Sequence, residues 1–205
     1  GALAENSKLI KAAIKQSRVI QADDFRQLFK LIRTLDSWNK WELHEELPQT
    51  AAIITISGGA GAVISDWCEK FSIEIPEMSR ETFLGLSKLY PEWMPPNKFA
   101  LIDIWPAVEN AAGDYQSVVL DVMKRSLADP NVGALFMTAF YSEKAWRIDW
   151  TKIEPILDKY RKPVFIWLFG EYKDVLKAEK IFERLNLPLF DSERNMVAVL
   201  KKILK

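Results

Sequence analysis

The sequence predicts an α/β fold with a mostly parallel open sheet and helices on both of its faces. From Ala51 onward, apolar segments of strand length alternate with segments whose apolar residues follow the helical period. The segment 163–169 is nearly all apolar, which is typical of a strand that is covered on both faces. A glycine-rich turn at 57–61 follows the first of these strands directly. Strands separated by helices in this way form a parallel sheet with crossover connections.

Each predicted element rests on a local pattern. Strands are expected where β-branched and aromatic residues cluster, and helices where apolar residues recur every three or four positions. Asp129 and Pro130 end the strongest helical pattern, because proline cannot continue a helix. The expected strands are 51–56, 72–76, 99–104, 132–138, 163–169 and 187–190, and the expected helices cover 62–71, 81–89, 115–127, 153–160, 175–185 and 196–204.

The first part of the chain does not follow this alternation. A helix is expected over 6–16, a short strand over 17–20, and a second helix that Asp23 caps. Two helices and one short strand cannot enclose a core, so this segment is expected to pack onto something else or to end a larger unit. The polar segment 37–49 reads as a linker.

The turn at 57–61 is the strongest candidate site. A strand delivers the chain to Ser57, Gly58, Gly59, Ala60 and Gly61, and a helix begins there. The first N–H groups of a helix lack partners and its dipole is positive at this end, so the turn attracts anions. It fits neither the phosphate-loop pattern nor the full dinucleotide fingerprint. The alternative is that the glycines only let the helix and strand pack closely.

Other loops are expected at the same edge of the sheet, since ligands bind beyond the carboxyl ends of parallel strands. These loops contain Asp103, 140–141 and 170–171. Asp103 either positions a loop of the active site or simply caps the next turn. Trp93, Trp105, Trp146 and Trp150 also lie in segments that read as loops, where they either fold back over the core or line an interface.

Composition excludes several classes of protein. Of the 205 residues, 49% are hydrophobic and 27% charged, which indicates an ordinary globular protein. The formal net charge is zero, so nothing favours nucleic acid or an anionic membrane as partner. A single cysteine, Cys68, forms no internal disulfide framework and agrees with a cytoplasmic location. His44 is the only histidine, so no metal ligand set is expected; it lies in the linker, where we expect no catalytic role.

Several motifs in order resemble the NDP-forming acyl-CoA synthetases, the family of ADP-forming acetate–CoA ligase and of succinyl-CoA synthetase. Residues 1–4 (Gly-Ala-Leu-Ala) match the end of the family's Ser-His-Thr-Gly-Ala-Leu-Ala-Gly segment. Residues 57–61 match its Ser-Gly-Gly-Pro/Ala-Gly turn, and 127–132 match its Leu-Ala-Asp-Pro-Asn-Val. The family sequence that follows the first segment matches residues 12–16 and 19–20. The Lys-Pro-Val with which the family enters a strand matches residues 162–164. The resemblance covers the whole chain.

The resemblance implies three parts. Residues 1–38 would be the tail of the preceding flavodoxin-like subdomain, 39–49 a linker, and 50–205 a flavodoxin-like CoA-ligase domain similar to the C-terminal domain of the succinyl-CoA synthetase β-subunit. The family interconverts acyl-CoA, ADP and phosphate with carboxylate, CoA and ATP through a phosphohistidine. The turn at 57–61 would be one of two helix starts that hold it. By alignment, the histidine would lie two positions before Gly1.

Further expectations follow from the resemblance. The full-length protein would use CoA, ADP or ATP and Mg, bound by CoA-binding and ATP-grasp subdomains, and could form homo-oligomers. The 205-residue chain is expected to bind no cofactor and to lack ligase activity alone; CoA-dependent ATP turnover by it would overturn this.

The chain departs from the family pattern at two places. The usual Asn-Pro-Val-Asp is Ala100-Leu101-Ile102-Asp103, and Arg18 stands where glycine is common. The first change means either a different substrate loop or a copy that has lost activity. A non-catalytic regulatory or scaffold module from the same family therefore remains an alternative. A stand-alone flavin- or nucleotide-binding protein fits the first 40 residues poorly.

Overall fold

A five-stranded, all-parallel sheet forms the centre of the computed structural model, which describes residues 7–17, 19–43, 47–142, 144 and 148–204. The strand order is β2-β1-β3-β4-β5, the order of a flavodoxin-like sheet. The predicted α/β fold class is therefore confirmed. The strands are β1 (Ala51–Thr55), β2 (Leu101–Asp103), β3 (Ala134–Tyr141), β4 (Val164–Gly170) and β5 (Leu189–Phe190).

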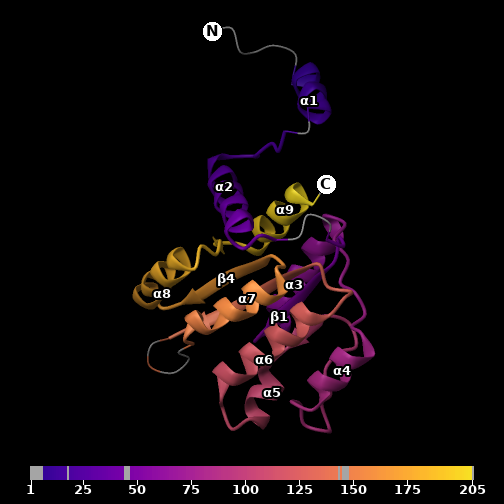
Figure 1. Cartoon of the computed structure of the whole chain (residues 1–205), viewed down its shortest axis with the longest axis vertical. Helices are drawn as coiled ribbons and strands as arrows, with labels where there is room; N and C mark the ends of the chain where they lie inside the picture. The colour runs from indigo at the N-terminus through magenta and orange to yellow at the C-terminus, as the bar shows by residue number, and fades with distance from the viewer. Residues whose placement is uncertain (1–6, 18, 44–46, 143, 145–147, 205) are drawn as a thin grey trace.

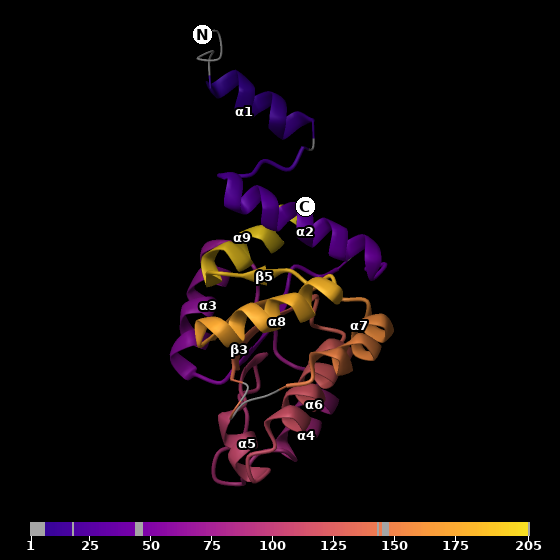
Figure 2. The same cartoon turned by 90° about the vertical axis from the view of Figure 1, so that its left-hand side faces the viewer.

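Helices cover both faces of the sheet (Figures 1 and 2). One apolar cluster joins the sheet to helices α4 to α8, and the other joins the opposite face to α2, α3 and α9. The helices are α1 (Ser7–Gln16), α2 (Phe25–Lys40), α3 (Gly58–Lys70), α4 (Arg80–Ser87), α5 (Trp105–Asn110), α6 (Tyr115–Ala128), α7 (Glu154–Tyr160), α8 (Tyr172–Arg184) and α9 (Glu193–Ile203), with a 3-10 turn η1 (Trp150–Ile153) before α7.

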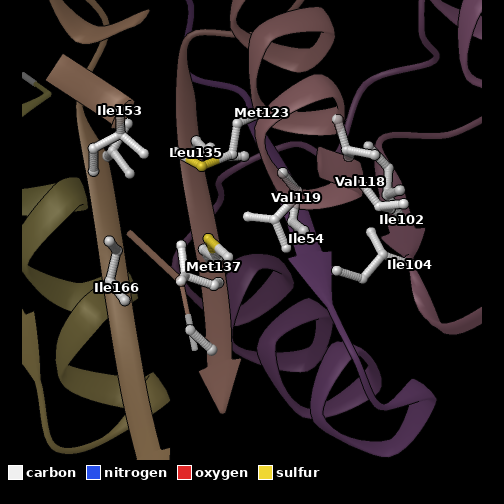
Figure 3. Packing of buried hydrophobic residues seen from close by; sticks show 14 of the residues in the cluster. Ile54, Ile102, Ile104, Val118, Val119, Met123, Leu135, Met137, Ile153 and Ile166 are labelled. Atoms are coloured by element: carbon white, nitrogen blue, oxygen red, sulfur yellow. The ribbon is translucent and has the colours of Figure 1, made fainter. Parts of the chain in front are cut away.

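The central strand β1 is buried along its whole length, as its apolar sequence requires. Its side chains alternate between the two clusters: Ala52 and Ile54 belong to one, and Ala51 and Ile53 to the other. In Figure 3, Ile54 meets side chains of the neighbouring strands and of α6, among them Val119. This packing fixes the position of β1, which ends just before the glycine-rich turn.

Helix α2 packs with its polar side inward. Gln27 and Thr34 are buried against the domain, whereas the side chains of Phe25 and Phe29 are 79% and 64% exposed. The helix starts at Asp24, whose carboxylate accepts a hydrogen bond from the N–H of Gln27, one residue later than predicted. In both views α1 stands away from the sheet, and α2 lies along α9 (Figures 1 and 2).

Two of the expected strands are absent from the described residues. The segment 72–76 makes only one bridge, between Glu74 and Thr50, because it runs beside β1 for a single residue before Pro76. The described residues of 17–20 form no strand, since no neighbouring strand lies there to pair with. Trp105 and Trp150, expected in loops, begin α5 and η1; Trp150 is completely buried.

Hydrogen bonds to Asp129 connect the start of α4 and the segment before β4 with the end of α6, at the edge of the sheet where the strands begin. Asp129 is 1% exposed, and its carboxylate accepts hydrogen bonds from the N–H of Ser79 at 2.8 Å and of Asn131 at 2.9 Å. Its carbonyl accepts a bond from Lys162 Nζ at 2.7 Å. The Leu-Ala-Asp-Pro-Asn-Val and Lys-Pro-Val motifs thus meet here, at the edge opposite the glycine-rich turn.

Among the described residues, no helix has the length and apolar content needed to cross a membrane.

Candidate anion site at the start of α3

Helix α3 begins at the glycine-rich turn. Ser57 is its N-cap residue, and Gly58, Gly59 and Ala60 are its first three residues. The N–H of Gly61 donates to the carbonyl of Ser57 at 3.0 Å, the first bond of the helix. Within the described chain, no acceptor is bonded to the N–H groups of Gly58, Gly59 and Ala60. Gly58 and Gly59 are exposed and Ala60 is half-buried, so the three neighbouring donors lie at the solvent-facing start of the helix.

Ser57 does not cap the helix with its side chain, although serine commonly does. Helices α4 and α9 also start at serines, and there Ser79 and Ser192 each accept a bond from the third N–H of the helix. The backbone angles of Ser57 (φ −144°, ψ 118°) are extended like those of Ser192 (φ −153°, ψ 147°). The start of α3 therefore keeps an N–H group open that its serine could occupy.

The hydroxyl of Thr55 bonds to both backbone polar groups of Ser57. Thr55 Oγ1 accepts a bond from the N–H of Ser57 at 3.0 Å and donates to the carbonyl of Ser57 at 2.8 Å. Thr138 Oγ1, on β3, donates to Thr55 Oγ1 at 2.9 Å. Both threonines are fully buried. Neither threonine was among the residues predicted for the site, and the sequence offers only a weak indication of them: one threonine in each of two otherwise apolar central strands.

The glycines of the turn divide into two kinds. A β-carbon on Gly61 would lie 3.0 Å from Leu101 Cδ1 and 3.1 Å from Thr55 Cγ2, so the close packing of helix on strand favours glycine there. A β-carbon on Gly59 would meet nothing nearer than Ser57 Oγ at 3.8 Å. The packing interpretation therefore accounts for Gly61 and leaves Gly59 without a reason inside the described chain.

This difference predicts opposite effects of two alanine substitutions on stability. Gly59→Ala is expected to raise the free energy of unfolding by about 0.5–1 kcal/mol, because alanine loses less backbone entropy in a helix. Gly61→Ala is expected to lower it by about 1–2 kcal/mol through overpacking against buried Thr55. Urea unfolding of both variants measures the difference. Equal effects of the two substitutions would contradict the division.

Asp103 lies beside the turn at the end of β2. Its Oδ1 accepts a bond from the N–H of Trp105 at 3.0 Å, and its carbonyl accepts one from the hydroxyl of Tyr90 at 2.6 Å. Its Oδ2 lies 3.6 Å from where a β-carbon on Gly58 would be. Burial, together with the charge of Asp103, raises the pKa of Tyr90 above its ordinary value, so this phenol stays protonated and keeps donating.

A pocket of about 200 Å³ opens between Asp103 and the start of α3. Thr55, Gly58, Tyr90, Asn97 and Asp103 supply its polar groups. Its apolar lining comes from the loop after α4, from β2 and from α5, namely Met94, Pro95, Pro96, Leu101 and Pro106. The pocket lies at the carboxyl ends of β1 and β2, since its lining includes Thr55 and Asp103, the last residues of these two strands. The fold thus brings together the turn and Asp103.

The other expected loops are not part of this group. Phe140 and Tyr141 lie inside β3, which is longer than predicted, and Gly170 ends β4. Cys68 is fully buried on α3, and burial raises the pKa of its thiol to about 12, so it is a packing residue. His44, Trp146 and the Gly-Ala-Leu-Ala segment lie outside the described residues.

The strand order and the parallel pairing of all five strands define a flavodoxin-like α/β domain. The chain is homologous to ADP-forming acetate–CoA ligases, as the resemblance predicts. It is 25% identical over 198 residues to acetate–CoA ligase (ADP-forming) II of Archaeoglobus fulgidus, covering 95% of this chain and 27% of that protein. It is 24% identical to the α-subunit of the corresponding enzyme of Pyrococcus furiosus, covering 97% of this chain and 41% of that subunit.

The fold recurs in a solved structure. The crystal structure of PH0766 from Pyrococcus horikoshii OT3 superimposes with a TM-score of 0.78 at 21% identity, covering 98% of this chain and 44% of that chain. No protein-family profile matches the sequence. The chain thus spans between about a quarter and two fifths of the curated relatives named above.

Proposed function

We propose that this chain is a domain of an NDP-forming acyl-CoA synthetase and that the start of α3 holds the phosphohistidine of that enzyme. The reaction is the interconversion of acyl-CoA, ADP and phosphate with carboxylate, CoA and ATP. The observation that carries the proposal is the set of open N–H groups on Gly58, Gly59 and Ala60. Homology to ADP-forming acetate–CoA ligases supports the choice of reaction.

The chemistry of the turn suits a phosphoryl group. A phosphorylated imidazole carries close to two negative charges and needs fixed donors that are not themselves phosphorylated. Backbone N–H groups meet this need, and a helix start adds about 1 kcal/mol of favourable electrostatic energy, more where water is excluded. Gly58 and Gly59 have no β-carbon to hinder close approach of the phosphate.

We propose further that the histidine, CoA, the nucleotide and Mg are bound by other parts of the enzyme. In this proposal, residues 1–38 belong to the preceding subdomain, 39–49 link it to 50–205, and Asp103 positions the loop that begins α5. The outward apolar side of α2, with Phe25 and Phe29 exposed, supports a neighbouring subdomain there. Helix α2 continues to Lys40, so its last two residues lie in the proposed linker 39–49.

A phosphate titration followed by amide NMR tests the proposal on the 205-residue chain. Inorganic phosphate is expected to shift the amide signals of Gly58, Gly59 and Ala60 in a saturable way, with a millimolar dissociation constant. Thr82 and Asn195 are internal controls, because serine caps already occupy their N–H groups. Equal shifts at all five amides, or none, would contradict phosphate binding at α3.

One observation favours the second candidate, a non-catalytic regulatory or scaffold module. The carboxylate of Asp103 lies beside Gly58, where its charge opposes an incoming phosphate. The segment 100–102, which leads into Asp103, has Ala-Leu-Ile in place of the family's Asn-Pro-Val. Failure of the wild-type chain to bind phosphate, together with a full-length sequence lacking the Ser-His-Thr segment, would favour this module.

A further inference from the structure

We propose that the pocket between Asp103 and the start of α3 binds a basic side chain of a neighbouring subdomain, whose positive charge pairs with Asp103. The proposal rests on the proposed function for the phosphoryl group that would lie beside the pocket. It goes beyond that function because it names the chemistry of the partner, an ammonium or guanidinium group at the end of an aliphatic stem.

The carboxylate of Asp103 has acceptor capacity for such a group. Its Oδ1 accepts the N–H of Trp105, which leaves room for a second bond to the same oxygen. No donor of the described chain is bonded to Oδ2. Asp103 is half-buried, so water screens an ion pair there less than it screens one on the open surface. One carboxylate can thus position the loop through Oδ1 and bind a cation through both oxygens.

The lining of the pocket fits the stem of a basic side chain. Lysine and arginine pack their methylene groups on apolar surface and keep the charged end on a polar partner. Here three prolines, a methionine and Leu101 supply the apolar surface, and Asp103 supplies the partner. None of the described residues that line the pocket is a lysine or an arginine, so its own wall does not neutralise Asp103.

The size of the pocket points to a single side chain. Its volume of about 200 Å³ is below the roughly 300–1,000 Å³ of pockets that hold drug-sized ligands. A nucleotide or CoA is larger than that space, whereas one long side chain fits it. The charge of Asp103 and this volume together favour a basic side chain over an anionic cofactor.

The position of the pocket explains why the partner would carry this side chain. Gly58 lines the pocket and also supplies one of the open N–H groups of α3. A subdomain that brings a phosphohistidine to Gly58 would therefore also cover the pocket. The phosphoryl group and Asp103 are both negative and repel each other at short range. A cation on Asp103 replaces this repulsion with attraction, so cation and phosphate should each tighten the binding of the other by the same factor.

The first measurement uses n-butylguanidinium as the probe and n-butylurea, which has the same stem without the charge, as the control probe. Asp103→Asn keeps an oxygen for the N–H of Trp105 and removes the charge. Glu109→Gln is the matched control, because it removes an exposed carboxylate of α5 that bonds to the indole N–H of Trp105 and lies outside the pocket lining. Amide NMR at constant ionic strength follows Asn97 and Leu101, which line the pocket outside the turn.

We expect n-butylguanidinium to shift both amides in a saturable way, with a millimolar dissociation constant in the wild-type and Glu109→Gln chains. The dissociation constant should rise at least about tenfold in Asp103→Asn, since a charged hydrogen-bonded pair is lost. n-Butylurea should bind the wild type as weakly as the charged probe binds Asp103→Asn. No binding of n-butylguanidinium, or equal binding to Asp103→Asn, would overturn the inference and leave phosphate binding at the turn intact.

The second measurement repeats the phosphate titration with saturating n-butylguanidinium. The phosphate dissociation constant at Gly59 and Ala60 should fall about fivefold in the wild type and stay unchanged in Asp103→Asn. Phosphate that binds the wild type equally with and without the probe would overturn the inference. A chain that binds the probe through Asp103 but binds no phosphate would support the site for a basic group and overturn the proposed function.

Calorimetry on the full-length protein distinguishes a side chain of the neighbouring subdomain from a free amine. The side chain would already fill the pocket there, so n-butylguanidinium is expected to bind at least about tenfold more weakly than it binds the 205-residue chain. Equal affinity in the full-length protein and the 205-residue chain would overturn the assignment to a side chain.

Discussion

On the proposed function, replacing Gly59 with aspartate is expected to lower ATP formation from acyl-CoA, ADP and phosphate about 100-fold in the full-length protein that contains this chain. The new carboxylate would lie at the second residue of α3, where it competes for the open N–H groups and repels the phosphoryl group. Loss of a single preorganised donor of this kind costs roughly 100- to 1,000-fold in rate. The substitution should not unfold the domain, because an acidic residue in the first turn interacts favourably with the helix dipole.

The matched control is Ala62→Asp, which adds the same charge to the same helix at an exposed position further along it. The rate of ATP formation is measured for both variants at saturating substrate, and circular dichroism confirms that both fold. A Gly59→Asp enzyme that retains more than half of the wild-type rate would show that the start of α3 holds no phosphoryl group. Equal losses in both variants would point to a general effect of charge on this helix.

Replacing Asp129 with alanine is expected to lower the free energy of unfolding by about 3 kcal/mol. The buried carboxylate accepts bonds from the N–H groups of Ser79 and Asn131, and alanine would leave both donors without a partner. A buried unsatisfied donor costs about 1–3 kcal/mol. The bond to Ser79 also fixes the residue that caps α4, so the start of that helix should loosen.

Urea unfolding measures the change, and two variants set its scale. Asp129→Asn keeps one acceptor oxygen and should lose about half as much stability. Asp121→Ala breaks an ion pair with Arg125 whose side chains are 33% and 36% exposed, and should cost less than about 1 kcal/mol. A loss below about 1 kcal/mol for Asp129→Ala would mean that the hydrogen bonds to the Asp129 carboxylate contribute little to the stability of the domain.

Hydrophobic periodicity was enough to predict most of the sheet and its helices. The near-continuous apolar run of β4 and the capped, periodic pattern of α6 are signals that depend only on neighbouring residues. The prediction failed at 72–76, where an apolar alternation forms only one bridge at Glu74. Strand formation requires a paired edge, and the sequence of a segment does not say whether such an edge is nearby.

The candidate site was predictable in part. The glycine-rich turn and Asp103 stood out because each follows an apolar strand, and parallel strands bring such ends to one edge. Thr55 and Thr138 carried no comparable signal, because 83 residues separate the two hydroxyl groups that bond. Nor does the sequence show that Ser57 leaves its own helix uncapped, since serine before a helical pattern ordinarily indicates a cap.

The sequence by itself determined the parallel α/β architecture, the position of the glycine-rich turn and the family resemblance that homology to acetate–CoA ligases confirms. These properties follow from residue types and their spacing along the chain. Only the tertiary structure decided which glycine serves packing and which helix start stays open. The first outcome depends on the contacts of Gly61 with Leu101 and Thr55, and the second on the orientation of the Ser57 side chain.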